Sequence, residues 1–291
     1  IEPGGITSEF ASNVMKHIES NGGMLDDEYL PILQKYIGGA RNRSGGQGIY
    51  QSCDVYFYHL AQRIGMDPIA EMNRRCGLGE EFPLPVTSQF YGTVPDPEWK
   101  LNKFGREWQA FDTVNATIGQ GYMLASPLQL AVSAARVATG RHVMPRLTMD
   151  TPPKGFDQVD FPPQHVAYVR QAMSDVVNGP GTAGRGRLPF DDILMAGKTG
   201  TSQVRHITRA ERESGVLKNE DIEWRSRDHA LFVAYAPVEK PRYALSVVVE
   251  HGGSGSAAAA PVARTIMEAT LELDPATNRS QRVAVSPERE G

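Results

Sequence analysis

Four successive residues, Lys198-Thr199-Gly200-Thr201, combine an ammonium group, two hydroxyls and a glycine. If the run is an extended strand, Lys198 and Gly200 lie on one face and the two threonines on the other. Apolar residues precede the run, which favours a strand with a polar rim, and glycine leaves room for another backbone to approach. A cation beside hydroxyls and free edge amides suits a carboxylate on a peptide-like ligand. Four such residues by themselves more often form an ordinary strand end, with a lysine before a turn.

A second cluster, Ser52-Cys53-Asp54, places a hydroxyl and a carboxyl group two residues apart. Apolar side chains at helical spacing over residues 56–64 predict an amphipathic helix that ends at Gly65. Ser52 lies at the expected start of this helix, where a hydroxyl commonly caps a free backbone amide. Helix capping and a part in proton transfer are therefore two interpretations of the same serine.

The periodicity elsewhere predicts mainly helices, followed by strands late in the chain. Helices are expected over residues 25–37, 67–76, 127–139 and 166–177, and a capping box begins the third of them at Ser126. Residues 45–48 are expected to be a flexible loop, and residues 79–113 an irregular Pro-rich segment. Two apolar runs, 230–236 and 243–250, favour a hairpin, and an alanine-rich helix follows. This order predicts an α+β fold with a largely antiparallel sheet packed by helices.

The composition is that of a soluble globular protein, with 40% hydrophobic and 22% charged residues among 291. No apolar run is long enough to span a bilayer. The net charge of -4 gives no reason to expect nucleic acid as a partner. Two cysteines and seven scattered histidines show no metal-ligand spacing, so neither a metal nor a cofactor is expected.

The order of several motifs carries more information than any one of them. Ser52-Cys53-Asp54 is followed by I-G-Q-G-Y at 118–122, by A-S-P-L-Q at 125–129, by the Lys198 run and by H-G-G-S-G at 251–255. K-T-G is itself a motif of serine β-lactamases and penicillin-binding proteins. The succession resembles the transpeptidase domain of class B penicillin-binding proteins, most closely the elongation-type penicillin-binding protein 2 group of Gram-negative bacteria.

The resemblance implies a penicillin-binding transpeptidase fold similar to that of the serine β-lactamases. It places the transpeptidase domain at residues 49–273, leaving residues 1–48 unassigned and 274–291 as a disordered tail. It also implies a peptidoglycan D,D-transpeptidase that cross-links stem peptides through a serine acyl-enzyme and is a target of β-lactams. A D,D-carboxypeptidase or β-lactamase-type hydrolase on the same fold is one alternative, and a catalytically inactive member that binds a ligand or partner is another.

The resemblance also assigns roles to individual residues. Ser52 would pass protons to and from the nucleophile and the leaving group, and the charge of Lys198 would support the Ser52 hydroxyl and attract the substrate carboxylate. Asp54 stands where many members have asparagine, although aspartate also occurs in proteins resembling this group.

The strand that follows Lys198 would bind the substrate. Thr199 and Thr201 match the hydroxyls beside the lysine, with Thr201 binding the terminal carboxylate of the stem peptide or of a β-lactam. Around Gly200 the strand would pair with the acyl donor's backbone and lend an amide to the oxyanion hole near Thr201.

The implied partners are peptidoglycan stem peptides, β-lactams and other proteins of cell-wall elongation and cell shape. The implied location is the periplasmic face of the bacterial inner membrane. Members of the family are held there by an N-terminal membrane helix, and this chain shows neither that anchor nor a signal peptide at its first residue.

One departure concerns the family's first motif, S-x-x-K, which supplies the nucleophilic serine and its base. No serine in this chain has a lysine three residues later. We expect that the chain begins downstream of the nucleophile or has lost that segment, and the other account is a member that has shed it. In either case, the polypeptide as written is expected not to form an acyl-enzyme.

Overall fold

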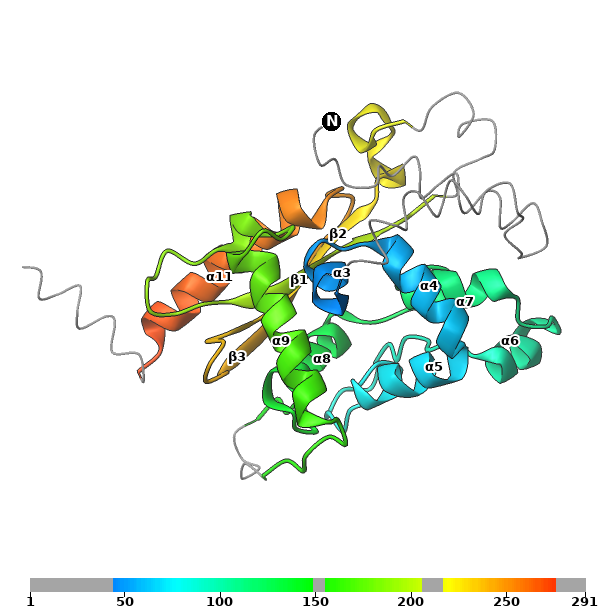
Figure 1. Cartoon of the computed structure of the whole chain (residues 1–291), viewed down its shortest axis with the longest axis horizontal. Coiled ribbons are helices and arrows are strands. Elements are labelled where there is room, and N and C mark those ends of the chain that lie inside the picture. Colours follow the sequence, from blue (N-terminus) through cyan, green and yellow to red (C-terminus); the bar gives the residue numbers. More distant parts are fainter. Residues whose placement is uncertain (1–43, 149–154, 206–216, 276–291) are drawn as a thin grey trace, which may run out of the picture.

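The computed structural model describes residues 44–148, 155–205 and 217–275 (Figure 1). The predicted helix over residues 25–37 lies outside this part. Helices make up most of its first half: α3 (Gly45–Tyr50), α4 (Asp54–Ile64), α5 (Met66–Arg75), α6 (Pro97–Phe104), α7 (Ala110–Thr117), α8 (Pro127–Thr139) and α9 (Pro163–Asn178). The strands β1 (Ala196–Ser202), β2 (His229–Ala236) and β3 (Tyr243–Val249) follow, and α11 (Ala260–Leu273) comes last. Short 3-10 turns and the π-helical turn η4 (Gly255–Ala259) connect them.

The strands form an antiparallel sheet in the order β1-β2-β3, as the α+β prediction required. The two apolar runs form the predicted hairpin, in which Ala230 pairs with Val249 and Ala236 with Tyr243. On the other side of β2, Lys198 of β1 pairs with Val233. β1 therefore lies at one edge of the described sheet, with backbone groups that no further described strand covers.

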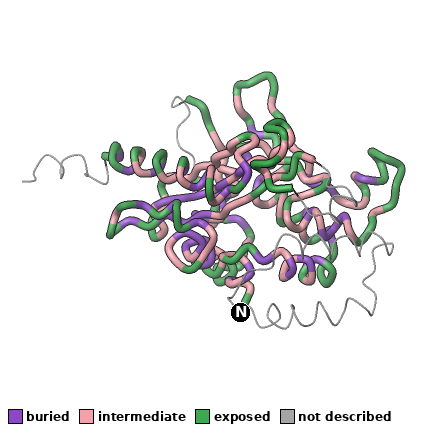
Figure 2. Tube along the Cα trace, turned by 90° about the horizontal axis from the view of Figure 1, so that it is seen from above, coloured by how far each residue is buried: buried purple, intermediate pink, exposed green. Residues whose placement is uncertain are grey.

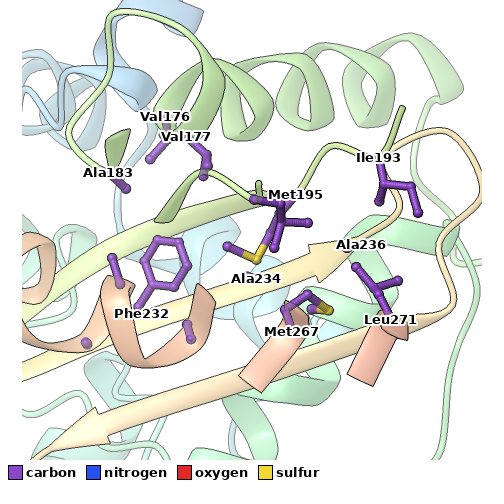
Figure 3. Close-up of a cluster of buried hydrophobic side chains, with 14 of the residues drawn as sticks. Val176, Val177, Ala183, Ile193, Met195, Phe232, Ala234, Ala236, Met267 and Leu271 are labelled. Atoms are coloured by element: carbon purple, nitrogen blue, oxygen red, sulfur yellow. The ribbon is translucent and has the colours of Figure 1, made fainter. Parts of the chain in front are cut away.

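The main core lies on one face of this sheet. Alternate residues of β2, including Phe232 and Ala234, point to this face and are fully buried. They pack against Met267 and Leu271 of α11 and against Val176 of α9 (Figure 3). Figure 2 shows buried positions in the interior of the trace, and within the sheet they belong mainly to β2, since no residue of β3 is fully buried. The sheet is thus held rigidly from this side by apolar contact.

The opposite face of the sheet packs against α8. Tyr235 and Ala196 point to this side and contact Ala138 of α8 and Met173 of α9. The predicted capping box is confirmed, since the Ser126 hydroxyl accepts from the Gln129 amide and the Gln129 side chain accepts from the Ser126 amide. Helices therefore cover both faces of the sheet.

The prediction of a flexible loop at residues 45–48 is wrong, because these residues belong to α3. Ser44 caps this helix, and its side chain forms a reciprocal capping box with Gln47. A Cβ atom on Gly48 would lie 2.7 Å from the Tyr56 ring, so glycine serves close packing here and not flexibility. α3 also crosses the predicted domain boundary at residue 48, and the Tyr168 ring of α9 lies over Gly46.

The prediction of an irregular segment at residues 79–113 is confirmed for residues 79–96 but is wrong at residues 97–104 and 110–113, which belong to α6 and α7. Asp96 caps α6 in front of Pro97, and α7 follows within a few residues. The ammonium of Lys100 in α6 lies 2.6 Å from the carboxylate of Asp112 in α7, and both side chains are buried. This ion pair joins two short helices whose own sequences show little periodicity.

Asp274 is the first residue of the predicted disordered tail, and it is buried at the end of α11. Arg242, beside β3, forms an ion pair with its carboxylate at 2.9 Å. Residues 276–291 lie outside the described part. Among the described helices, none combines the length and the apolar character needed to cross a membrane.

The buried pair generates a stability prediction. Lys100→Met removes the cation and leaves the Asp112 carboxylate buried without its charge partner, which typically lowers the free energy of unfolding by about 3–5 kcal/mol. Lys103→Met, on the exposed part of the same helix, is the matched control and should change it by less than about 1 kcal/mol. Urea denaturation followed by circular dichroism measures both values, and equal losses would contradict the assignment.

Candidate active site

Lys198 and Ser52 meet at the edge of the sheet, although 146 positions separate them in the sequence. The Lys198 ammonium donates to the Ser52 hydroxyl over 2.8 Å and to the carbonyl of Thr199 over 2.9 Å. Ser52 lies in the short connection between α3 and α4, two helices labelled in Figure 1. Its hydrogen bond to Lys198 places it beside β1. The fold thus joins the two clusters singled out by their chemistry.

Ser52 does not cap α4, so the capping interpretation is wrong. The helix begins at Asp54, its N-cap position is Cys53, and no side chain caps it there. Ser52 instead has a φ of 52°, a left-handed conformation that is uncommon outside glycine. Backbone bonds from Ser52 to Ile49 and from Cys53 to Gly48 hold this conformation. The strained turn points the hydroxyl at Lys198.

Asp54 supplies a negative charge beside the Lys198 ammonium. Burial lowers the pKa of Lys198 to about 8, and the Asp54 carboxylate partly opposes this decrease. Burial also raises the pKa of Asp54, while the lysine charge acts in the opposite direction. Burial, with a contribution from Asp54, raises the pKa of Tyr58 as well. The charged forms of Lys198 and Asp54 are therefore both costly to bury, and each of these two charges stabilises the other.

Thr199 lies on the opposite face of β1 from Lys198, as strand alternation predicts. Its hydroxyl oxygen lies 3.0 Å from that of Thr182. The backbone of Thr182 is fixed by two bonds, because its amide donates to Tyr50 and its carbonyl accepts from Ser256. Thr182 therefore links β1, the end of α3 and the turn η4.

Another segment of the chain packs closely against β1 at Gly200. A Cβ atom on Gly255 would lie 2.4 Å from the carbonyl oxygens of Gly200 and Leu231, so the H-G-G-S-G segment packs directly on the paired strands. Thr201, the next residue, is exposed, and its carbonyl accepts a hydrogen bond from the Gln120 side chain over 2.9 Å.

The structure thus assembles Ser52, Asp54 and Lys198 in one place, with Thr199, Gly200 and Thr201 along the adjoining strand. The sequence reasoning missed Thr182, whose surroundings carry no motif of fixed spacing. It noted Gln120 within I-G-Q-G-Y but gave it no role. In the described part of the chain, no group of three or more His, Cys, Asp or Glu side chains could hold a metal ion.

Comparison with known proteins agrees with this geometry. The family model described as the penicillin binding protein transpeptidase domain matches residues 27–268, most of the chain. The chain belongs to this family of penicillin-binding transpeptidase domains. The hydrogen-bonded Lys198 and Ser52 both lie within the residues that this family model matches.

Several relatives are named peptidoglycan D,D-transpeptidase MrdA. The chain is 37% identical over 231 residues to the peptidoglycan D,D-transpeptidase MrdA of Acinetobacter baumannii, covering 74% of this chain and 33% of that protein. It is 32% identical to MrdA of Haemophilus influenzae, covering 76% and 35%. The chain thus spans about a third of the length of these penicillin-binding relatives.

Solved structures show the same fold. The penicillin-binding protein 2 of Pseudomonas aeruginosa, in complex with WCK 5153, matches with a TM-score of 0.66 and 36% identity, over 80% of this chain and 50% of that one. A Helicobacter pylori complex between penicillin-binding protein 2 and MreC matches with a TM-score of 0.66 and 31% identity, over 78% and 39%.

The paired charges generate a titration prediction. In Asp54→Asn the carboxylate that raises the pKa of Lys198 is gone while burial remains, so this pKa falls below about 8. NMR of 13C-methylated lysine measures the change. Asp191→Asn, an exposed carboxylate before β1, is the control and leaves the Lys198 titration in place. A rise, or no change, in Asp54→Asn would contradict the coupling.

Proposed function

We propose that this chain is the substrate-binding part of a peptidoglycan D,D-transpeptidase that works by serine acyl transfer. The observation that carries the proposal is the 2.8 Å hydrogen bond from Lys198 to Ser52. It joins the second and third motifs of a penicillin-binding domain in one polar site at the edge of a sheet. Relatives named peptidoglycan D,D-transpeptidase support the same activity. We place the domain at residues 49–273, together with the α3 helix that crosses its start.

The proposed reaction has two steps. A serine attacks the D-Ala-D-Ala amide, D-alanine leaves, and the amine of a second stem peptide then resolves the ester. Ser52 relays the proton between the nucleophile and the leaving amine, because its hydroxyl accepts from Lys198 and can donate in turn. The ammonium of Lys198 keeps this hydroxyl polarised and attracts the carboxylate at the end of the peptide. Asp54 keeps Lys198 charged against the effect of burial.

The open edge of β1 is the proposed binding strand for the acyl donor. An extended peptide can add to a free sheet edge through main-chain hydrogen bonds. The hydroxyl of Thr201 supplies a donor for the terminal carboxylate, and Gly200 leaves the approach unobstructed. Thr199 supports the strand from its other face through its contact with Thr182. A backbone amide near Thr201 stabilises the developing oxyanion, a type of contact that typically contributes about 3 kcal/mol to the barrier.

The nucleophile of this reaction belongs to an S-x-x-K motif that does not occur in the given sequence. We propose that this motif acts beside Ser52 in the intact protein, where the Lys198 network can serve it. We further propose a site of action on the periplasmic face of the inner membrane. The relative solved in complex with MreC supports partners among the proteins of cell-wall elongation.

Labelling with fluorescent penicillin tests this function. The intact protein should form a covalent adduct on the serine of its S-x-x-K motif, and peptide mapping identifies that serine. The 291-residue chain alone should form none, and an adduct on it would show that a serine within it is the attacker. An intact protein that binds stem peptide but is never acylated would favour an inactive binding member. Rapid hydrolysis of the adduct in the presence of acceptor amines would favour a hydrolase.

The role of Lys198 generates a variant prediction. In the intact protein, Lys198→Ala removes the cation that polarises Ser52 and attracts the carboxylate, so penicillin acylation falls at least about 100-fold. Its unfolding midpoint changes little, because the variant also removes the cost of burying the ammonium, and burial already raises the pKa of Asp54, which favours its neutral form once the lysine is gone. Lys240→Ala, an exposed lysine between β2 and β3, is the control. An unaltered acylation rate in Lys198→Ala would contradict the assigned role.

The pKa of Lys198 also predicts a pH dependence. Lys198 is charged below a pH of about 8 and loses its proton above it. Acylation by a carboxylate-bearing penicillin should therefore decline as pH rises through about 8, and Asp54→Asn should move the decline to lower pH. Stopped-flow acylation rates between pH 6 and 10 measure both limbs. If the acylation rate of Asp54→Asn declined at the same pH as that of the wild type, the decline would not be caused by the loss of the Lys198 charge.

A further inference from the structure

Gln120 reaches the site strand from a loop that no part of the proposed mechanism uses. It lies between α7 and α8, and its side-chain amide nitrogen donates to the Thr201 carbonyl over 2.9 Å. The two residues are 81 positions apart in the sequence. Gln120 therefore contacts the exposed end of β1 from outside the sheet.

This contact defines which backbone groups the strand edge offers. In an antiparallel strand, the N–H and C=O of one residue point to the same side. The Thr201 carbonyl points toward Gln120 and away from β2, so its N–H also points to the open side. The Thr199 carbonyl, which accepts from Lys198, lies on the same side as that of Thr201 because the two residues are in phase. An incoming extended peptide would pair with these groups.

The Gln120 side-chain amide occupies the position that a bound peptide's N–H would take when it pairs with the Thr201 carbonyl. Its distance to the Thr201 oxygen equals that of a sheet hydrogen bond, about 2.9–3.0 Å. A side-chain amide has the same donor and acceptor pair as a peptide unit. Unpaired strand edges readily pair with other chains, and proteins commonly cover them. Gln120 thus serves as a one-residue cover for the binding edge.

The backbone around Gln120 is fixed, so that only its side chain can leave. Gly119 and Gly121 have φ values of 78° and 71°, which suit glycine, and the Gln120 amide donates to the Asn115 carbonyl over 2.9 Å. The Tyr122 ring packs on Trp99 of α6 at 5.4 Å between centroids. Gln120 is half-buried and its bonding partner Thr201 is exposed, so the Gln120 side chain can leave the Thr201 carbonyl by a change of rotamer. Displacement of Gln120 therefore needs no loop movement.

We propose that Gln120 occupies the β1 edge in the unliganded protein and that the acyl donor's backbone N–H displaces it from the Thr201 carbonyl. This rests on the proposed function, because it assumes that the ligand is a peptide that pairs with β1. The exchange breaks one hydrogen bond and forms another, so Gln120 weakens donor binding without blocking it. Gln120 sets the affinity for the acyl donor and protects the edge from unintended pairing.

A titration with a model donor tests the proposal. The 291-residue protein is titrated with diacetyl-L-lysyl-D-alanyl-D-alanine and followed by 15N NMR, which requires no nucleophile. Gln120→Leu removes the amide, and Gln120→Asn retains an amide that is one methylene too short to reach Thr201. Each should bind the peptide about fivefold more tightly than the wild type, the effect of one net hydrogen bond. In the wild type, the Gln120 side-chain amide signals should move to solvent-exposed values with the same dissociation constant.

Gln203→Leu makes the same substitution at an exposed position two residues beyond Thr201 and should leave the affinity within twofold. Unchanged or weaker binding in both Gln120 variants would overturn the proposal, as would Gln120 amide signals that stay in place at saturation. Failure of every variant to bind would overturn it too, since removing the cover would then expose no usable edge. Penicillin labelling of the intact protein decides separately on the proposed function.

Discussion

The hydrogen bond between the Lys198 ammonium and the Ser52 hydroxyl is the interaction on which the proposed site depends. It requires an edge strand and a helix connection to be held within 2.8 Å of each other. The sheet holds the strand through pairing with β2 and through apolar packing of α11 on one face and α8 on the other. The α3 helix holds the serine, because its glycines let Tyr56 and Tyr168 pack against its backbone. Much of the described fold can be understood as the support for this one contact.

That contact is maintained against opposing costs. Burial disfavours the charged forms of both Lys198 and Asp54, and each charge supports the other. Ser52 adds a left-handed backbone conformation that persists only where neighbouring structure imposes it. Such costs gather at functional sites, and the apolar core under the sheet supplies the stability that tolerates them. The proposed role of Gln120 at the strand edge is a similar compromise, because its hydrogen bond to Thr201 covers the edge and lowers the affinity for the acyl donor.

Prediction from sequence succeeded where local pattern and tertiary structure agree. The hairpin of β2 and β3 follows from apolar alternation, and α8 follows from its capping box at Ser126. Prediction failed at α3 and α6, where glycine and proline suggested loops. At α3 the glycines are needed for contact with aromatic rings that come from elsewhere in the chain. At α6 a buried ion pair with Asp112 stabilises a helix whose own periodicity is weak.

The sequence by itself determined the residue types of the site and their order along the chain, and these were sufficient to indicate the family. It determined that Lys198 and Thr199 would lie on opposite faces, because alternation is a local property of any strand. Only the tertiary structure decided that Ser52 faces Lys198 and does not cap α4, that Thr199 pairs with Thr182, and that Gln120 covers Thr201. These contacts join segments that are distant in the sequence. Their geometry is set by how sheet and helices pack together, which no short stretch of residues encodes.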